Sequence, residues 1–348
     1  MKYRSRAALA LAAVSLLGVV ACGGDDDDST SGDGGGGGES TTLSIVGFAV
    51  PEAANKAIAD EWAKTPEGEN VEFKTSYGAS GDQSRAVVDG LDADYVHFSV
   101  ASDVTRLVDE GLVAEDWDQG DNKGVVSSSI VVFGVREGNP KNIQTWDDLV
   151  KPGVEIVTAN PASSGAARWN ALAAWGQVIE AGGSEADAEA YVDKFVDNVV
   201  SLTASGRDTT TAFLGGTGDV AMLYENEAIL AKQSGETDFE YIIPDTTILI
   251  ENPGAVLTDA DPKAQEWLDF VLSEDGQRQF ALKGFRPIVD LDVDEVEGAN
   301  DPGDPFPEVE NLLTVADDFE SWDALSTKFF DEEDGIVTKA ILESGKSE

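Results

Sequence analysis

Hydrophobic and polar positions change their spacing repeatedly between residues 43 and 250. Short apolar runs such as residues 130–135 are typical of buried strands, and longer stretches with apolar positions three and four apart, such as residues 165–179, are typical of helices. Alternation of the two predicts parallel strands with helices on both faces. We expect strands at residues 43–46, 71–74, 94–98, 130–135, 154–158, 199–202, 219–223, 241–243 and 247–250, and helices at residues 52–63, 80–91, 146–150, 165–179, 186–195, 209–214 and 225–233.

The last part of the chain, residues 291–348, has a different composition. It contains 18 acidic residues against three lysines, and it retains aromatic residues able to anchor it to a core. We therefore expect surface helices that pack on the body of the protein. The aromatic anchors are Phe319, Trp322, Phe329 and Phe330.

The N-terminus predicts export and a lipid anchor. A short basic region precedes an apolar run over residues 7–21, which is too short to span a bilayer and is typical of a signal peptide. The run ends in Val-Val-Ala-Cys, which resembles a bacterial lipobox and would make Cys22 the lipidated residue. The alternative is an ordinary secreted protein with a chance cysteine. Residues 22–42 then form an acidic Gly/Asp/Ser tether, because residues 23–40 hold no apolar side chain to bury.

Charge and composition exclude several classes of function. The chain has 67 acidic and 23 basic residues, a formal charge of −44, so nucleic acid and anionic lipid surfaces would be repelled. One cysteine excludes an intrachain disulfide framework, a zinc ribbon and a cysteine-held iron–sulfur cluster. One histidine, His97, leaves little room for a His-rich metal site. We expect no metal and no cofactor.

Three loops open helices with small residues after predicted strands, at residues 78–83, 160–170 and 204–211. The first amides of a helix have no intrahelical acceptor and carry the positive end of its dipole, so such loops favour anions. The second loop adds the hydroxyl of Ser164 and lacks the lysine of a P-loop. The alternative for the first loop is a well-capped helix, since Ser80 and Gln83 form a capping-box pattern.

Four segments resemble bacterial sulfate-binding proteins, the solute receptors of sulfate/thiosulfate ABC importers. They are NPASSGAARWNALAAWG (160–176), GASGDQSRAVVDGLDAD (78–94), VREGNPKNIQTWDDLVKPGVEIVTANP (135–161) and GDVAMLYENEAIL (218–230). The resemblance implies a type II periplasmic-binding-protein fold, with two Rossmann-like α/β lobes, a hinge and a ligand cleft between them. It also implies a monomer that binds sulfate and hands it to permease subunits. We expect the first lobe at residues 43–135 with part of 244–348, and the second lobe at 136–243. Residues 244–348 would return to the first lobe and end in the C-terminal helices.

The resemblance also implies a ligand set made of hydrogen-bond donors. Tyr224 stands where enteric members of the family carry a tryptophan, so a phenol O–H would replace an indole N–H; taken alone, Tyr224 reads as a half-buried aromatic residue. Arg168 and Arg207 match family arginines, and we expect them behind the site, offsetting the ligand's charge through peptide groups. The residues implied to bind sulfate are Ser80, Ser164, Gly165, Ala166, Gly206 and Tyr224.

Two departures from the family pattern leave the anion open. Asp82 replaces a lysine and Asp208 replaces a glycine. A carboxylate in the cleft would repel sulfate but accept the proton of phosphate, so the positions of these side chains decide between the two anions. We expect both to cap helices, since both lie at helix starts.

Other functions remain possible at this point. The ligand could be another tetrahedral oxyanion: thiosulfate, molybdate, tungstate or phosphate. A different class of function, a serine esterase-like enzyme, would use Ser164 or Ser80 as nucleophile. That reaction needs a base, and His97 is the single histidine of the chain.

Overall fold

The computed structural model describes residues 40–293 and 295–346. The predicted signal peptide, Cys22 and all but the last residues of the predicted tether lie outside the described residues. The first strand begins at Thr41, two residues earlier than expected. Among the described residues, no helix has both the length and the apolar character needed to cross a bilayer.

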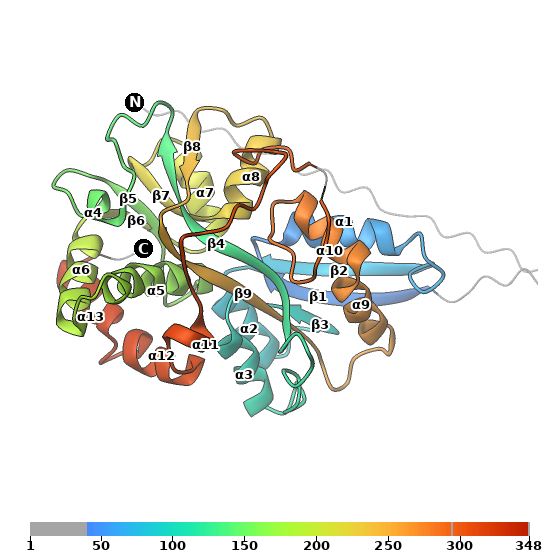
Figure 1. Cartoon of the computed structure of the whole chain (residues 1–348). Coiled ribbons are helices and arrows are strands. Elements are labelled where there is room, and N and C mark those ends of the chain that lie inside the picture. Colours follow the sequence, from blue (N-terminus) through green and yellow to red (C-terminus); the bar gives the residue numbers. More distant parts are fainter. Residues whose placement is uncertain (1–39, 294, 347–348) are drawn as a thin grey trace, which may run out of the picture. The chain divides into compact units, whose positions relative to one another are not determined.

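A ten-stranded sheet runs through the protein (Figure 1). Its main path has the order β2-β1-β3-β9-β4-β7-β5-β6, with β10 paired to β9 and β8 paired to β4. The strands are β1 (Thr41–Phe48), β2 (Val71–Gly78), β3 (Tyr95–His97), β4 (Val125–Arg136), β5 (Ile156–Ala159), β6 (Val199–Thr203), β7 (Val220–Tyr224), β8 (Phe239–Ile242), β9 (Thr246–Val256) and β10 (Asn311–Leu313).

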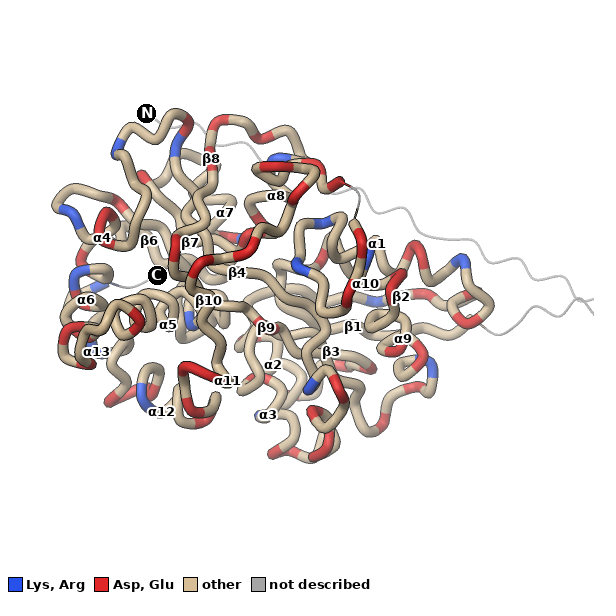
Figure 2. The backbone as a smooth tube through the Cα atoms, in the orientation of Figure 1, with Lys and Arg blue, Asp and Glu red and all other residues tan. Residues whose placement is uncertain are grey.

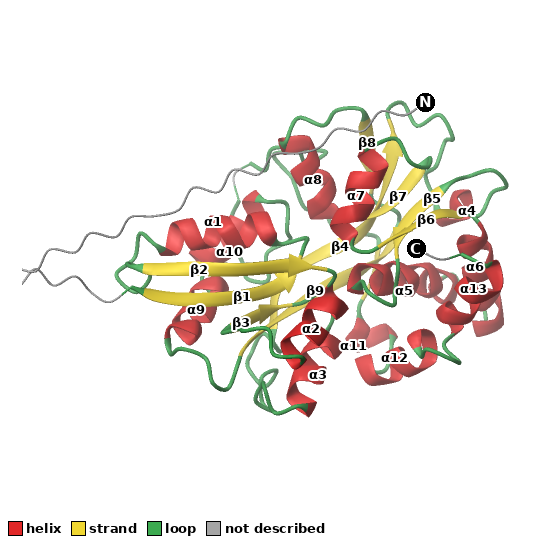
Figure 3. Cartoon of the chain, turned by 180° about the vertical axis from the view of Figure 1, so that it is seen from behind, coloured by secondary structure: helices red, strands yellow, loops and turns green. Residues whose placement is uncertain are grey.

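Helices cover the sheet on both sides, as the alternating pattern predicts (Figure 3). Three of them, α3, α9 and α10, are additional to the predicted helices. The helices are α1 (Glu52–Trp62), α2 (Ser80–Val88), α3 (Ala101–Asp109), α4 (Trp146–Leu149), α5 (Gly165–Glu180), α6 (Glu185–Asp197), α7 (Gly206–Leu214), α8 (Glu225–Gln233), α9 (Lys263–Leu272), α10 (Glu274–Leu282), α11 (Val315–Asp318), α12 (Trp322–Phe330) and α13 (Ile336–Ser344).

Two long strands, β4 and β9, connect the two halves of the sheet. The half built on β1–β3 is called here the first lobe, and the half built on β5–β7 the second lobe. β4 pairs with β9 up to Ile130 and with β7 from Val131 onward, whereas β9 reaches β3 at its other end. The lobe boundaries expected after residues 135 and 243 stay predictions.

The strand directions correct one expectation. Within each lobe the pairs β1–β2, β1–β3, β5–β6 and β5–β7 are parallel, as predicted. The connecting strands β4 and β9 are antiparallel to each other and to their neighbours β3, β7 and β8. The sheet is therefore mixed, because the chain passes from one lobe to the other and back through these two strands.

The acidic C-terminal segment packs on the second lobe through its aromatic residues, as expected. Trp322 of α12 meets Trp169 of α5 edge to face, with ring centroids 4.8 Å apart. Phe329 meets Trp175 in the same way at 4.9 Å. The acidic side chains can stay in water while these rings are buried, which explains how so charged a segment folds onto the body.

Candidate functional site

Every predicted ligand residue lies where a strand ends and a helix begins. Ser80 is the first residue of α2, which follows β2. Ser164 is the N-cap of α5, and Gly165 and Ala166 are its first two residues. Gly206 opens α7 after β6, and Tyr224 ends β7 as the N-cap of α8. The predicted ligand residues therefore lie at the positive ends of four helix dipoles, where the first amides have no acceptor inside the helix.

The structure brings the helix starts together across the lobes. A Cβ atom added to Gly165 would lie 2.5 Å from the side chain of Ser99 in the first lobe, and one added to Gly206 would lie 3.0 Å from the Cβ of Ala166. The Gly81 amide donates to the Ser163 carbonyl at 3.0 Å, which joins the start of α2 to the loop before α5. The two lobes are thus closed on each other, with the predicted ligand residues at their junction.

The hydroxyl of Ser80 is engaged within the first lobe, which leaves its amide as the candidate donor. The hydroxyl is buried, donates to a carboxylate oxygen of Asp103 at 2.6 Å and accepts from the Ser99 amide at 2.9 Å. Its single proton is thereby used within the first lobe. The Ser80 amide, as the first of α2, has no acceptor inside the helix and is the group left for a ligand.

The hydroxyl of Ser164 does not cap its own helix. Its side chain is 3% exposed, and among the described residues the backbone of α5 donates no capping hydrogen bond to it. A serine N-cap usually accepts such a bond from the third helical amide. The Ser164 hydroxyl and the first amides of α5 are therefore the groups that the predicted cradle of donors would use, and their role in binding stays a prediction.

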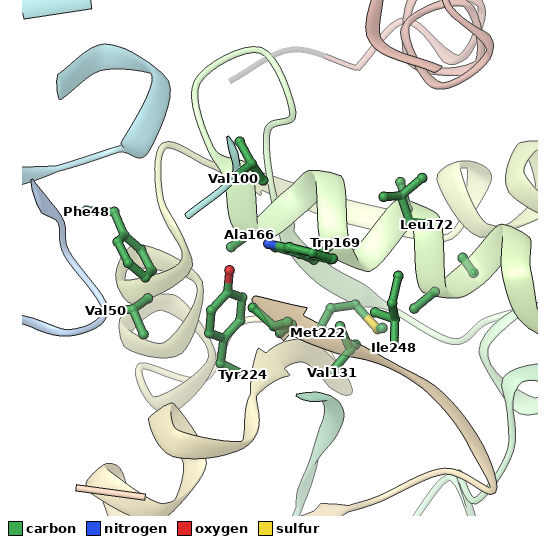
Figure 4. Packing of buried hydrophobic residues seen from close by; sticks show 14 of the residues in the cluster. Phe48, Val50, Val100, Val131, Ala166, Trp169, Leu172, Met222, Tyr224 and Ile248 are labelled. Carbon is green, nitrogen blue, oxygen red and sulfur yellow. The ribbon is translucent and has the colours of Figure 1, made fainter. Parts of the chain in front are cut away.

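Tyr224 lies at the centre of this junction. It is 2% exposed, and its hydroxyl lies 2.7 Å from the Ser99 hydroxyl. Figure 4 shows the phenol oxygen directed toward Ala166 and Trp169. Burial raises the pKa of Tyr224 above its ordinary value, so the phenol keeps its proton at neutral pH and is able to donate it.

The two arginines expected behind the site contact peptide carbonyls in the loops around the predicted ligand residues. Arg168 donates to the Pro161 carbonyl at 3.1 Å. Arg207 donates to the Val50 carbonyl at 3.1 Å and forms a bidentate pair with the buried Glu227, both contacts at 2.8 Å. Each guanidinium thus contacts a peptide carbonyl in the loops around the site.

The expectation that Asp82 and Asp208 both cap helices is right for Asp208 and wrong for Asp82. Asp82 is half exposed and pairs with Arg85 one turn further along α2. The Asp208 carboxylate accepts from the hydroxyl of Ser205, the N-cap of α7, at 2.7 Å, and that hydroxyl accepts from the Asp208 amide at 3.1 Å. The Asp208 carboxylate therefore supports the cap of its own helix, as expected, whereas the Asp82 carboxylate caps nothing and is held by an ion pair on the surface of α2.

His97 is not placed as a catalytic base. It is fully buried, and its ring nitrogens lie 3.2 Å from the Asn55 side-chain oxygen and 3.1 Å from the Ser127 hydroxyl. Burial lowers the pKa of His97 to about 3. Both nitrogens are used in the core, so the arrangement that an esterase-like serine would need is not formed.

Three contributors to the site were not predicted from the sequence. Ser99 joins Ser80 to Tyr224. Asp103 fixes the Ser80 hydroxyl and is paired with Arg106 at 3.1 Å. Val50, in the loop after β1, packs against Gly206. A small residue just after a predicted strand is the signal that Ser99 shares with the predicted loops.

The electrostatics of the site suit an anion that carries no proton. Acidic residues are spread over most of the elements, so they repel an anion at long range, but salt screens this beyond about 8 Å (Figure 2). Locally, α2, α5 and α7 each begin with amides that have no acceptor inside the helix, and Ser164 and Tyr224 bring hydroxyls at the starts of α5 and α8. Across the described part of the chain, His, Cys, Asp and Glu side chains form no group of three that could hold a metal ion. The arrangement can bind an oxyanion by hydrogen bonds alone.

Comparison with known proteins agrees with this geometry. Residues 43–286 match the family described as bacterial extracellular solute-binding protein. A sulfate-binding protein of Synechococcus elongatus is 39% identical over 331 residues, which is 92% of this chain and 91% of that protein. A thiosulfate-binding protein of Pseudomonas aeruginosa is 38% identical over 67% of this chain and 73% of its own. The solved structure of the sulfate-binding protein SubI from Mycobacterium tuberculosis matches with a TM-score of 0.77 and 39% identity, over 84% of this chain and all of that one.

Proposed function

Because the chain belongs to the family of bacterial extracellular solute-binding proteins, we propose that it binds sulfate between its two lobes and delivers it to the permease of an ABC importer. The two-lobed α/β fold expected of that family is present. Members of the family take part in transport and carry out no reaction, so the chain is a binding protein and not an enzyme. The site acts outside the cytoplasm.

One observation carries the choice of ligand. Donors from helix starts of both lobes meet at a buried junction, while the two carboxylates that could have turned into it are engaged elsewhere. Asp103 is buried close by, but it accepts from Ser80 and Arg106. Sulfate is fully ionised and has no proton to give, so a site of donors suits it, whereas hydrogen phosphate would need an acceptor.

Thiosulfate is the second ligand that we propose. It is also a divalent tetrahedral anion without an acidic proton at neutral pH, and the similarity extends to thiosulfate-binding proteins. Molybdate and tungstate have the same shape but are larger, and a closed junction around Tyr224 favours the smaller ion.

Delivery to a permease needs the protein near the membrane. A lipid on Cys22 would hold it there, and the acidic tether would let the folded body reach the permease as a monomer. These residues lie outside the described part of the chain, so this part of the proposal depends on the sequence pattern.

Calorimetry with a panel of anions tests the proposal. We expect sulfate to bind with micromolar or tighter affinity, about −8 kcal/mol or better. The affinity should stay nearly constant from pH 5 to 8, because neither sulfate nor an amide titrates there. Thiosulfate, molybdate, tungstate and phosphate complete the panel. Tighter binding of molybdate than sulfate, or a tenfold gain in affinity on acidification, would overturn the choice of ligand.

A further inference from the structure

Ser99 is the residue through which the two lobes meet. It lies between β3 and α3 in the first lobe and is 1% exposed. Its amide donates to the Ser80 hydroxyl, and its carbonyl accepts from the indole N–H of Trp169 at 2.8 Å and from the side-chain amide of Asn252 at 3.0 Å. Ser80 belongs to the first lobe, Trp169 to the second, and Asn252 to the connecting strand β9. The Ser99 backbone is therefore held from three directions.

The side chain of Ser99 faces the second lobe. Its hydroxyl lies 2.7 Å from the Tyr224 hydroxyl, and its Cβ and Oγ both lie 2.5 Å from where a Cβ of Gly165 would be. The Ser99 hydroxyl therefore lies next to the first residue of α5, where the helix amides have no acceptor inside the helix.

The protons of the two hydroxyls can be counted. Ser99 and Tyr224 carry one O–H proton each, and the bond between their oxygens uses one of them. The remaining proton is free to be donated to a ligand.

We propose that Ser99 belongs to the anion site and aims the Tyr224 hydroxyl at the bound anion. In this arrangement Ser99 donates to the phenol oxygen, and the phenol donates to the anion. The pair acts as one donor that forms only when the lobes close, because one hydroxyl comes from each lobe. This inference rests on the proposed function, since it requires that an oxyanion binds at the junction.

A double-mutant cycle with sulfate tests the inference. Ser99→Ala should weaken sulfate binding roughly 3- to 10-fold, because the phenol loses the group that orients it. If Ser99 acts through Tyr224, the double variant Ser99→Ala/Tyr224→Phe should bind within about twofold of Tyr224→Phe alone. Losses that multiply instead would mean that Ser99 acts independently, and wild-type affinity in Ser99→Ala would mean that it has no role in binding. Either result overturns the inference.

A matched control and a spectroscopic signal separate this role from a structural one. Ser44 is also buried, and its hydroxyl donates to the Asp92 carboxylate at 2.9 Å within the first lobe, so Ser44→Ala should leave sulfate affinity unchanged. Sulfate should perturb the ultraviolet absorption of tyrosine in the wild type, and this difference spectrum should shrink in Ser99→Ala and vanish in Tyr224→Phe. An undiminished spectrum in Ser99→Ala would contradict the inference.

Two further experiments keep the inference testable if Ser99→Ala does not fold or if the ligand is not sulfate. If Ser99→Ala does not fold, Ser99→Gly provides the same deletion at a position that lies outside a helix and a strand. If the wild type binds thiosulfate or molybdate and not sulfate, the proposed ligand fails, and the same cycle is run with that anion. The same coupling between positions 99 and 224 is then expected, and its absence would overturn the inference on its own.

Discussion

The hydroxyl groups of Ser99 and Tyr224 lie 2.7 Å apart, although 125 positions separate the two residues in the chain. Ser99 follows a strand of the first lobe, and Tyr224 ends a strand of the second. A bond this short between side chains of the two lobes forms only when the lobes are closed. Closure and the assembly of the donor group are therefore the same event at this point of the molecule.

Removing the Tyr224 hydroxyl should weaken sulfate binding without unfolding the protein. Tyr224→Phe keeps the buried ring and deletes one donor, so a sulfate oxygen is left unsatisfied in a closed junction. We expect a loss of about 1.5–3 kcal/mol, or roughly 10- to 150-fold in affinity, measured by calorimetry. Tyr224→Trp returns an N–H donor and should recover part of the loss for sulfate. Wild-type affinity in Tyr224→Phe would show that the phenol only packs.

Acidification should destabilise the fold through His97. Burial lowers its pKa from 6.5 to about 3, so between these values the unfolded chain binds a proton that the native protein does not. Stability therefore falls as the pH falls through this range, by about 2 kcal/mol between pH 6.5 and 5. Urea unfolding of His97→Gln, which has no such proton, should show a flatter dependence on pH. Equal slopes in the two proteins would contradict the assignment.

The buried pair of Arg207 and Glu227 should stabilise the fold only while both partners are present. Burial raises the pKa of Glu227, and Arg207 opposes this as its partner. Arg207→Met leaves a buried carboxylate unpaired and should cost about 2–4 kcal/mol in urea unfolding without sulfate. Arg207→Met/Glu227→Leu should regain most of the loss, because no unpaired charge remains.

An exposed pair provides the control for this experiment. Lys56 and Asp60 are 2.9 Å apart on α1, and both side chains are largely in water. Lys56→Met should change stability little, since solvent screens such a pair. A loss as large as that of Arg207→Met would mean that burial is not what makes the Arg207 pair matter.

Three helix starts of the site, those of α2, α5 and α8, could be predicted from the sequence because each is a local pattern. The bounds of α8 are as predicted and those of α5 agree within one residue, whereas α7 begins at Gly206, three residues before its predicted start. α3 was not predicted, because a buried carboxylate, Asp103, interrupts the apolar face that its sequence would otherwise present. The first half of β4 was missed for a similar reason. Three successive serines, at 127–129, lack the apolar pattern of a buried strand. In the structure they are buried, and their hydroxyls hydrogen-bond to His97, the Arg286 carbonyl and the Asn226 amide.

The partners of these helix starts could not be predicted in the same way. The bond between Ser99 and Tyr224 depends on how the lobes meet, and a single serine after a strand carries no sign of its partner. Likewise, the proton of the Ser80 hydroxyl is donated to Asp103, which lies 23 positions further along the chain and could not be paired with Ser80 from the sequence. Local sequence therefore predicts which groups reach the junction, and tertiary packing decides which of them keep a free proton.

The lipid anchor is tested by replacing one atom. Cys22→Ala removes the thiol on which the proposed lipid is carried. We expect the variant to accumulate as uncleaved precursor or to be released from the membrane fraction, because the tether that follows has no apolar residue to hold it there. Wild-type protein recovered from membranes with an unmodified Cys22 thiol, as seen by mass spectrometry, would contradict the proposal.

A methyl group at position 165 should block closure. Gly165 is the first residue of α5, and alanine is favoured over glycine in a helix, so Gly165→Ala should leave the free protein as stable as the wild type. The added Cβ would lie 2.5 Å from Ser99 and 3.2 Å from Val100, both in the first lobe. The clash arises only when the lobes meet. We expect sulfate affinity to fall more than 100-fold, and small-angle scattering to show less compaction with sulfate than in the wild type.

A second substitution distinguishes this clash from a loss of the amide donor. Gly165→Ala keeps the amide at position 165, so making room on the other lobe should restore binding if sterics are the cause. Ser99→Gly removes the two atoms that lie closest to the new methyl group and leaves only the looser contact with Val100. The double variant Ser99→Gly/Gly165→Ala should therefore bind sulfate more tightly than Gly165→Ala. It should still bind less tightly than the wild type, because the Ser99 hydroxyl is gone. A double variant no better than Gly165→Ala, or a wild-type protein that does not compact with saturating sulfate, would show that closure at this contact is not what assembles the site.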